Sequence, residues 1–493
     1  MRTVVLGAGL GGLSAACHLA GRGHEVVVVD QESVPGGRAG VVEEGGFRID
    51  TGPTVLTMVG LLEQTFAAAG TALEDHLTLR ILDPTYRACF PDGSELRVRP
   101  DRHAMAEEIR TFAGAGEAAA FERFCSWLGR MYRLELPHFI DRNYDSPLDL
   151  ARDPMALVRL VRLGGLRKLA PTVAGFFTDP RLQRIFSFQS MYAGLSPFEA
   201  LAIYSVITYM DMVEGVYFPE GGMHAVPRAL TSAAEKAGAT FHFATPVERI
   251  TRHADGSVQG ARLSSGELIA ADAVVCNVDV AVAYRSLLGL SPPRVASRGR
   301  YSPSCIVWLA GVRGALPAGA AHHNIHFGTS WREAFTALLA DGRRMPDPSI
   351  LVTSATASDP SLAPDGAITL FALEPAPNLD GNVDWASERQ RLRDELATRL
   401  GGLGYPVDDV VVERLTDPRD WEAQGLERGT PFALAHRFLQ TGPFRPGNAD
   451  RRIPGLVFTG MGTVPGVGIP MVLISGRLAA DRVDEWAGTR GRR

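Results

Sequence analysis

Three glycines near the N-terminus, Gly7, Gly9 and Gly12, have the spacing G-x-G-x-x-G, with Gly11 inside the same loop. In a dinucleotide site the first glycine allows a tight turn, the second lets the backbone approach a pyrophosphate, and the third lets helix and strand pack closely. Asp30 lies 18 residues after Gly12, where a carboxylate can accept hydrogen bonds from ribose hydroxyls. A glycine-rich turn without a ligand is the alternative, but this context favours dinucleotide binding.

The residues that flank this loop must form a strand, a helix and a second strand. Residues 3–6 and 25–30 are mostly apolar, and residues 13–21 between them are rich in alanine. Continuous apolar strands are typical of a parallel sheet that is buried on both faces. The sequence therefore predicts a βαβ unit whose helix N-terminus presents free N–H groups to phosphates.

A second glycine turn follows the βαβ unit. It contains Gly36, Gly37 and Arg38, and it is followed by the segment Gly52-Pro53-Thr54. Such a turn resembles FAD enzymes of the glutathione-reductase and amine-oxidase type. We expect the Arg38 guanidinium to neutralise a phosphate; the alternative is a surface arginine in a turn.

Near the C-terminus, residues 456–459 are apolar and precede a loop with repeated glycines. We expect a strand, a loop and a helix with proline near its first turn, whose N-terminus can lie against a flavin. The glycines and prolines of residues 453–476 argue against a membrane-spanning helix. The predicted cofactor-binding residues of this part, together with Val247 from the middle of the chain, are Gly460, Gly462, Gly468, Ile469, Pro470 and Met471.

Composition narrows the class of protein. The 493 residues suffice for about two or three domains. A net charge of −5 offers no general attraction for nucleic acid. The five cysteines are scattered without a C-x-x-C, which fits a reduced, cytoplasmic compartment. His322, His323 and His326 lack an evident further ligand, so we expect no metal site.

Several segments together resemble the bacterial-type phytoene desaturases, a family of FAD-dependent carotenoid oxidoreductases. Residues 34–39 and 50–54 are similar to the N-terminal signature of that family. Further similar segments are residues 185–190 (IFSFQS), 216–223 (VYFPEGGM), 321–325 (AHHNI), 359–364 (DPSLAP) and 444–446 (FRP). The family often has histidine where this chain has Val464, which argues against an essential acid or base there.

The resemblance implies a reaction on an apolar polyene such as phytoene. One hydrogen leaves as a hydride to flavin and another as a proton, so that several double bonds are introduced, as in lycopene formation. A hydrocarbon substrate requires a long apolar tunnel. Asp149 and Arg152, which share a helical face, are candidate catalytic residues by resemblance; a surface ion pair is the equal alternative. Oxygen and a membrane quinone are both open as the electron acceptor.

Because the substrate dissolves in lipid, we expect a cytoplasmic enzyme that is peripherally associated with membranes. Residues 155–177 combine apolar residues at helical spacing with four basic ones, which predicts a basic amphipathic helix. An ordinary helix with a solvated face is the alternative. The basic residues at the end of the chain, 490–493, are expected to be a solvated tail.

The predicted fold class is α/β, with a Rossmann-like FAD-binding domain, a mixed-sheet substrate domain and a helical, membrane-facing region. We expect the FAD-binding domain to comprise residues 1–85, 221–290 and 446–493. The helical region would be residues 86–220 and the substrate domain residues 291–445. Other functions remain open: a carotenoid isomerase or ketolase, a diapophytoene or hydroxycarotenoid desaturase, a flavin amine oxidase, or a noncatalytic FAD-binding protein.

Overall fold

A five-stranded parallel sheet gathers strands from distant parts of the chain. The computed structural model describes residues 1–490, so residues 491–493 of the expected tail lie outside the described residues. The sheet has the order β19 (Leu456–Phe458), β13 (Ala273–Cys276), β1 (Arg2–Leu6), β2 (Glu25–Val29) and β9 (Thr240–His242). The predicted βαβ unit is present, with α1 (Leu10–Gly21) joining β1 to β2.

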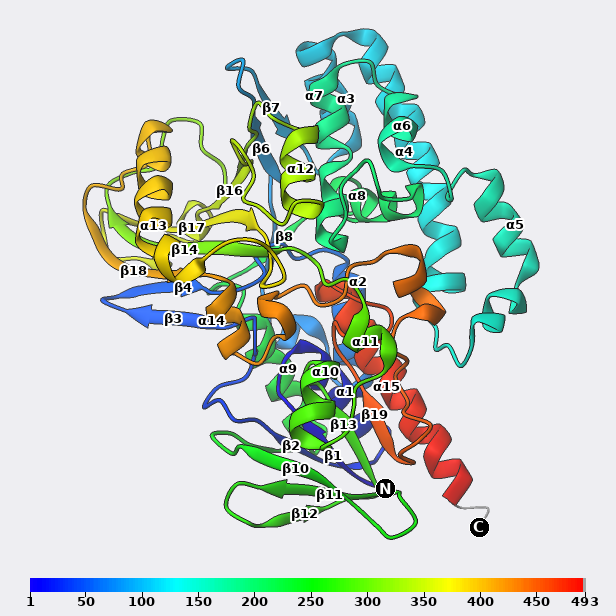
Figure 1. Ribbon diagram of the computed structural model, residues 1–493. Coiled ribbons are helices and arrows are strands. Elements are labelled where there is room, and N and C mark those ends of the chain that lie inside the picture. Colours follow the sequence, from blue (N-terminus) through cyan, green and yellow to red (C-terminus); the bar gives the residue numbers. More distant parts are fainter. Residues whose placement is uncertain (491–493) are drawn as a thin grey trace.

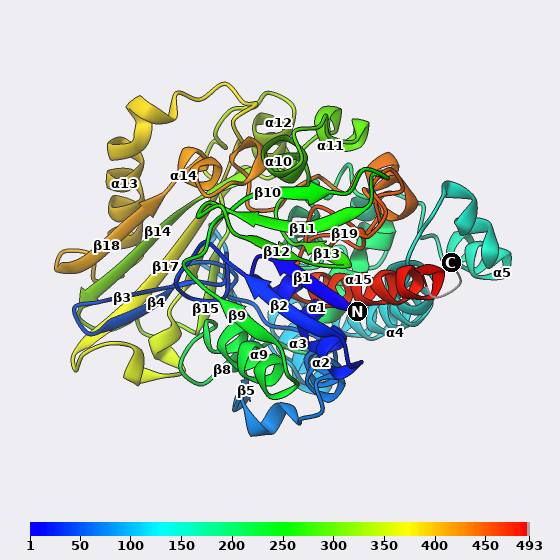
Figure 2. The ribbon, with the colours of Figure 1, turned by 90° about the horizontal axis from the view of Figure 1, so that it is seen from below.

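Both faces of this sheet are covered, which is why its strands are continuously apolar. Successive side chains of a strand point to opposite faces. Val5 and Val28 accordingly face α1, which packs on α9 (Ala225–Lys236) and α15 (Ile469–Arg490). Val4 and Val27 face the antiparallel sheet β10 (Val247–Arg252), β11 (Val258–Leu263) and β12 (Leu268–Ala270), seen beside the parallel sheet in Figure 2.

A seven-stranded mixed sheet forms a second body (Figure 1). Its order is β18 (Val410–Thr416), β14 (Ser304–Arg313), β17 (Ala367–Ala376), β16 (Ile350–Thr353), β15 (His323–His326), β6 (Tyr86–Cys89) and β7 (Glu95–Val98). Only β15 and β6 pair in parallel. Helix α13 (Trp385–Gly402) covers the face of this sheet that contains Trp308. The other face is covered by β4 (Phe47–Asp50), which forms a hairpin with β3 (Val41–Glu44).

Helices dominate the chain between these sheets. They include α3 (Arg102–Ala113), α4 (Ala115–Glu135), α5 (Pro154–Arg162), α6 (Leu169–Ala174), α7 (Pro180–Ile185) and α8 (Ser205–Met212). Strands β5 (Leu79–Ile81) and β8 (Tyr217–Pro219), one before and one after these helices in the chain, form a short antiparallel pair. The remaining helices are α2 (Val59–Ala68), α10 (Val280–Val282), α11 (Arg294–Arg298), α12 (Arg332–Leu339) and α14 (Pro418–Ala423).

Two expectations about the helical region need correction. Residues 86–98 are strands β6 and β7 of the mixed sheet, because β6 pairs with β15, which lies far along the chain. The single helix expected over residues 155–177 is two helices, α5 and α6. Gly164 has a φ of +81°, the left-handed conformation that ends a helix, so α5 stops at Arg162.

Among residues 1–490, none of the helices combines the length and the apolar character needed to span a bilayer. Residues 453–476, expected to be a strand, a loop and a helix, are β19, a glycine loop and the start of α15.

Candidate active site

The glycine loop between β1 and α1 has the backbone that its sequence predicts. Gly7 has a φ of +98°, which favours glycine, and a Cβ on Gly12 would lie 2.0 Å from the Gly7 carbonyl oxygen. Gly9 is the N-cap of α1, and no side chain caps the helix there. The first N–H groups of α1 are therefore free of a side-chain acceptor, which suits a pyrophosphate.

Asp30 fixes this loop from the end of β2. One carboxylate oxygen accepts a hydrogen bond from the Ala8 N–H at 2.6 Å, and the other accepts one from the Glu32 N–H at 2.8 Å. Burial raises the pKa of Asp30, and these two N–H groups oppose the shift. Val247 opens β10 near this carboxylate, since the Thr245 N–H donates to the Asp30 carbonyl at 2.8 Å. The structure thus brings Asp30 to the predicted dinucleotide loop, and Val247 lies two residues beyond the Thr245 that bonds the Asp30 backbone.

The Gly-Gly-Arg turn lies directly against the first loop. The Gly36 N–H donates to the Ala8 carbonyl at 2.9 Å, and Gly36 forms a parallel bridge with Gly9. Arg38 donates to the Pro431 carbonyl at 3.3 Å, and within residues 1–490 no carboxylate forms an ion pair with it. Burial lowers the pKa of Arg38 to about 10. The charge of Asp279 opposes this shift without forming an ion pair with Arg38, so a phosphate can be its direct anionic partner.

Asn277 is a site residue that sequence reasoning missed. It follows β13, and its side chain lies between the two glycine loops: a Cβ on Gly9 would lie 2.8 Å from its Nδ2, and one on Gly460 would lie 2.7 Å from its Oδ1. A Cβ on Gly11 would lie 3.1 Å from the Gly460 backbone. Ligands of parallel sheets bind beyond the carboxyl ends of strands. The position of Asn277 directly after a predicted strand could therefore have indicated in the sequence that it belongs to the site.

The C-terminal glycine loop is held by two further residues that were not predicted, Arg445 and His436. Arg445 is buried and donates to the carbonyls of Thr463 (3.1 Å) and Met461 (2.5 Å), among others. The His436 ring fills the space where a Gly466 side chain would lie, and it accepts a hydrogen bond from the Val467 N–H at 3.4 Å. The only sequence signal for this support was the FRP segment around Arg445.

Beyond this loop, Gly468 has a φ of +111° and leads into Ile469 and Pro470, the first residues of α15. Met471 and Val464 pack in one apolar cluster. Gly462 lies against α10, where a Cβ would meet the Val280 side chain at 3.0 Å. The loop therefore brings its predicted residues to the carboxyl edge of the parallel sheet.

The segment Gly52-Pro53-Thr54 joins the two bodies of the molecule. A Cβ on Gly52 would lie 1.8 Å from the Arg38 carbonyl oxygen, so this segment packs tightly on the Gly-Gly-Arg turn. Thr54 accepts a hydrogen bond from Thr353 of the mixed sheet at 3.5 Å. Asp50, just before it, accepts hydrogen bonds from the N–H groups of Met223 (2.8 Å) and His224 (3.0 Å).

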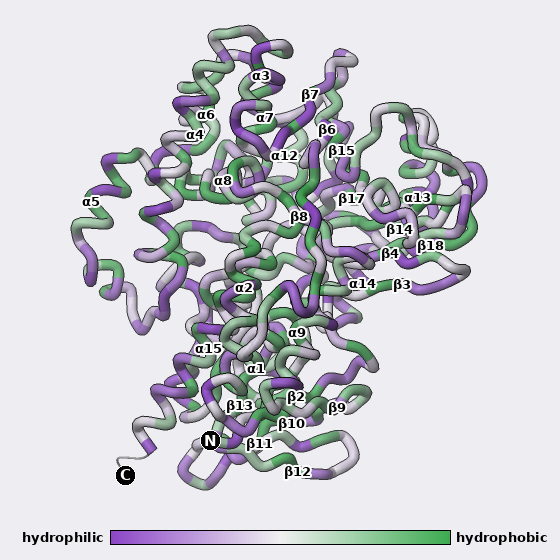
Figure 3. Tube along the Cα trace, turned by 180° about the vertical axis from the view of Figure 1, so that it is seen from behind, coloured by the Kyte–Doolittle hydropathy of each residue, from purple (hydrophilic) through white to green (hydrophobic). Residues whose placement is uncertain are grey.

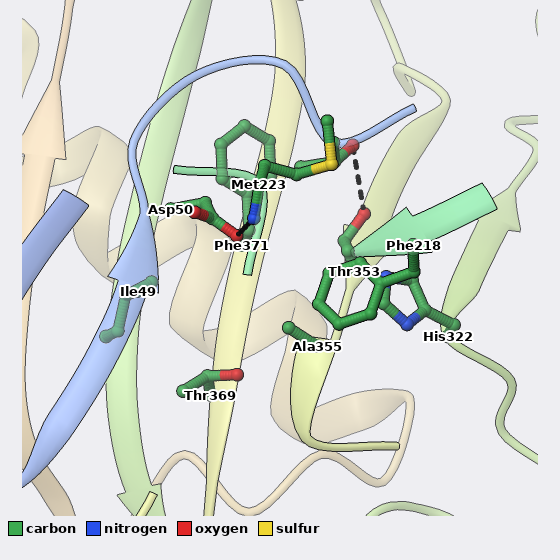
Figure 4. A pocket seen from close by; sticks show the side chains of 10 residues that line it. Ile49, Asp50, Phe218, Met223, His322, Thr353, Ala355, Thr369 and Phe371 are labelled. Atoms are coloured by element: carbon green, nitrogen blue, oxygen red, sulfur yellow. Dashed lines mark hydrogen bonds between the residues drawn. The ribbon is translucent and has the colours of Figure 1, made fainter. Parts of the chain in front are cut away.

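Figure 4 shows the cavity at this junction, with Asp50, Met223, His322 and Thr353 around it. Its volume is about 10 Å³, which is about the space of one water molecule. Burial raises the pKa of Asp50 to about 6 and lowers that of His322 to about 3. Burial therefore disfavours the charged form of both groups at this junction.

The three histidines considered as metal ligands have separate partners. His322 contacts Ser358 at 2.8 Å, His323 contacts Thr353 at 2.8 Å, and His326 contacts Tyr405 at 3.0 Å. Within residues 1–490 no group of three or more His, Cys, Asp or Glu side chains has an arrangement that could hold a metal ion.

Comparison with known proteins identifies the family. The family of flavin-containing amine oxidoreductases matches residues 10–484. The chain belongs to this family. Its solved relatives include a putrescine oxidase (TM-score 0.60, 16% identity, 98% of this chain and 99% of that one) and an oxidoreductase from Methanosarcina mazei (TM-score 0.60, 17% identity, 97% and 99%). At such identities this likeness shows the fold alone.

Sequence relatives place the chain among the carotenoid desaturases of this flavin-containing family. It is 49% identical to a phytoene dehydrogenase of Streptomyces griseus over 97% of this chain and 94% of that protein. It is 38% identical to a zeta-carotene-forming phytoene desaturase of Myxococcus xanthus, over 99% and 95%. A lycopene-forming phytoene desaturase of Pseudescherichia vulneris is 32% identical, over 98% and 99%.

The cofactor of this family member is FAD, and the site described above fits it. The space that a Cβ on Gly9 would enter, the free N–H groups of α1 and the unpaired Arg38 together suit a pyrophosphate. When bound, FAD accepts two electrons and one hydrogen from the substrate. The protein supplies the positions of cofactor and substrate and the path of the remaining proton.

Asp149 and Arg152 lie in a short 3₁₀ turn before α5. Asp149 accepts hydrogen bonds from the N–H groups of Asp145 (2.6 Å) and Ser146 (3.0 Å), and Arg152 pairs with it at 2.9 Å. These N–H groups, the largest influence, lower the pKa of Asp149. Leu150 of the same turn packs near Met471. The predicted catalytic role of this pair is still a prediction.

Asp149→Asn tests that role. Because the hydrogen bonds and the ion pair of Asp149 are all made with residues 145–152, we expect the variant to keep a rate of flavin reduction within a few-fold of the wild type and to melt at a lower temperature. Anaerobic stopped-flow reduction by substrate measures the rate without reoxidation. A fall of roughly 10²–10⁴-fold, the usual loss for a general base, would instead place Asp149 in the reaction.

Proposed function

We propose that this chain desaturates phytoene, or a closely similar acyclic carotene, and introduces several double bonds. The observation that carries the proposal is the 49% identity to a phytoene dehydrogenase over nearly the full length of both proteins. The chain is an FAD-dependent carotenoid desaturase. The number of double bonds introduced and the end product, of the lycopene type, are part of the proposal.

The apolar residues beside the C-terminal loop support a hydrocarbon substrate. Met58, Val206 and Met210 are buried together, and Met471 of the first turn of α15 packs against them. Such a lining offers almost no hydrogen bonds, which suits a polyene without polar groups. We propose that these residues line the tunnel near the flavin and that positioning is the main contribution of the protein to the reaction.

Incubation of the purified holoprotein with phytoene in liposomes tests the proposal. We expect the absorption of the extracted product to shift to longer wavelength as conjugated double bonds accumulate. Turnover of an amine instead of phytoene would support the amine-oxidase alternative, and a changed isomer or a new oxygen function would support an isomerase or ketolase. Oxygen and a membrane quinone are the proposed electron acceptors, and supplying each one separately after anaerobic reduction distinguishes them.

We also propose that α5 docks on the cytoplasmic surface of a membrane. It projects from the edge of the molecule (Figures 1 and 3). Met155, Val158 and Val161 of α5 are exposed, beside exposed Arg159 and Arg162. Leu148 before the helix is 80% exposed, which is unusual for a large apolar side chain next to others of its kind. This combination suits the interface of an anionic bilayer.

The double variant Val158→Asp, Val161→Asp tests the docking surface. We expect its recovery with floating anionic liposomes to fall about tenfold or more, because two apolar contacts are replaced by charges that the bilayer repels. The matched control is Leu403→Asp, Val411→Asp, which also changes exposed apolar residues but at the opposite end of the molecule. Equal recovery of both variants would contradict the proposal.

A further inference from the structure

Glu135, the last residue of α4, is a buried carboxyl group without a partner. Glu135 is only 5% exposed, and no donor forms a hydrogen bond with its Oε1. No residue within 1–490 forms a hydrogen bond or an ion pair with this carboxyl group. Burial raises its pKa well above the usual value, with no opposing contact. A lone buried carboxyl group costs stability, so its presence calls for a role beyond folding.

The surroundings of Glu135 are those of the proposed active site. Its helix neighbours Tyr132 and Leu136 pack against the cluster of Met58, Val206 and Met210, to which Met471 also belongs. Met58 follows the segment of Thr54, and Met471 begins α15. Met471, a predicted cofactor-binding residue, therefore lies near the end of α4, together with Met58, which is four residues after Thr54.

A second line of contacts leads to the glycine loop from Tyr204, two residues before Val206 of the same cluster. Burial is the main cause of the raised pKa of Tyr204, and a charge on Glu135 is the smallest contribution to it. The Tyr204 hydroxyl donates a hydrogen bond to the His436 carbonyl, and the His436 ring contacts the Val467 N–H in the glycine loop. Tyr204 and His436 thus connect the segment that precedes α8 to the flavin-binding loop.

The backbone changes its helical form at this residue. The α-helix ends at Glu135, and Leu136–Ile140 form a π-helical turn that contains Pro137. Proline has no N–H to continue the α-helical ladder, and π turns within helices occur frequently at functional sites. This turn carries Leu136 and Ile140 to the Met471 cluster and leaves Glu135 in the last α-helical turn.

Glu117, near the opposite end of α4, is a buried carboxylate with a structural role. One oxygen of Glu117 accepts hydrogen bonds from the Thr178 N–H (2.9 Å), the Asp179 N–H (3.1 Å) and the Thr178 hydroxyl. Glu117 and Glu135 are both buried on α4, but only Glu117 joins neighbouring elements. Glu135 therefore does not hold two elements together by hydrogen bonds, as Glu117 does.

We propose that Glu135 is the catalytic base of the desaturation. This inference rests on the proposed function. A saturated carbon next to the polyene loses a proton to the Glu135 carboxylate, and the electron pair of that C–H bond becomes the new π bond. The adjacent carbon loses its hydrogen with two electrons to FAD, which the activity of the family supplies. The carboxyl group then releases its proton to solvent, and the site is ready for the next double bond.

Several ionisable groups lie around Glu135, whose own pKa burial raises well above its usual value. Tyr132 lies on its own helix, with Glu214 against it; Tyr204 approaches from the preceding turn of α8, and His436 lies beyond it. Burial raises the pKa values of both tyrosines and lowers that of His436 well below its usual range. The pKa of Glu214 is also raised. Removal of the Glu135 carboxyl group by substitution therefore decides which of the two glutamates causes a pH dependence of the rate.

Glu135→Gln tests the chemistry. We expect kcat/KM to fall roughly 10²–10⁴-fold with FAD content unchanged, and Glu135→Asp to recover part of the activity. In the wild type kcat/KM should rise with pH through the raised pKa of Glu135, above that of free glutamate at about 4.3, because the base must be ionised. This acidic limb should vanish in Glu135→Gln. A wild-type rate, or an unchanged limb, would overturn the proposal.

A measurement without substrate separates a catalytic role from a structural one. In the folded protein the raised pKa keeps Glu135 protonated to a higher pH than in the unfolded chain, where a glutamate ionises above about pH 4.3. Folding therefore binds a proton, and stability decreases as the pH rises from that value toward the raised pKa. Glu135→Leu removes this cost, so its melting temperature should exceed that of the wild type by a margin that widens between pH 5 and pH 8.

Glu117→Leu is the matched control. It removes the acceptor of three hydrogen bonds, so it should melt at a lower temperature and keep its pH–rate profile; Glu117→Gln replaces it if the protein fails to fold. If Glu135→Leu also melts lower, the carboxyl group has a structural role and the proposal is wrong. If wild-type protein leaves phytoene unchanged, the proposed substrate fails, whereas the melting series still tests Glu135.

Discussion

Gly9→Leu is expected to abolish FAD binding and leave the fold intact. Gly9 has a φ of −72°, which any residue adopts, so leucine adds no backbone strain. Its Cβ would approach the Asn277 Nδ2 to 2.8 Å, and this flexible side-chain end can move. The rest of the leucine side chain would occupy the space through which the pyrophosphate approaches the loop.

The flavin absorbance of the purified variant, together with the cofactor released on denaturation, measures this loss. We expect almost no flavin and a melting temperature close to that of wild-type protein stripped of FAD. Gly116→Leu is the control, because a Cβ at Gly116 meets no atom within 4 Å. A Gly9→Leu protein that retains FAD would show that the pyrophosphate does not pass this loop. Release of a nicotinamide dinucleotide instead of flavin from the wild type would show that FAD is not the cofactor.

Arg445→Met is expected to destabilise the protein and weaken FAD binding together. The buried guanidinium donates to four carbonyls; those of Leu434 (3.1 Å) and Gln440 (3.3 Å) add to the two in the glycine loop. Burial lowers the pKa of Arg445 to about 10. Methionine has a similar length but donates no hydrogen bond, so these carbonyls would lose their donor.

Each buried carbonyl left without a donor costs about 1–3 kcal/mol, and relaxation of the loop recovers part of the sum. We expect a net loss of about 2–4 kcal/mol in the free energy of unfolding and at least a tenfold fall in affinity for FAD. Denaturant titration and flavin titration of the apoprotein measure the two. Arg437→Met, at an exposed arginine nearby, is the control. Unchanged affinity in Arg445→Met would mean that the loop holds its shape without this residue.

The sequence alone predicted the elements in which local pattern and packing agree. The strands around Val4 and Val27 are buried on both faces, so they are apolar throughout and stand out in the sequence. The spacing of Gly7, Gly9 and Gly12 follows from contacts within one turn, so it too is visible in the sequence. By contrast, the helix predicted over residues 155–177 failed because Gly164 ends it.

What only the tertiary structure decided are contacts between segments that lie far apart in the chain. Asn277 and Arg445 have no motif of their own. They matter because folding places Asn277 between the two glycine loops and Arg445 against the carbonyls of the C-terminal one. The difference between Glu117 and Glu135 is likewise invisible in the sequence of α4, where both are glutamates of one helix. Whether a buried carboxylate has a hydrogen-bond donor depends on which other element packs beside it, and that is a property of the folded molecule.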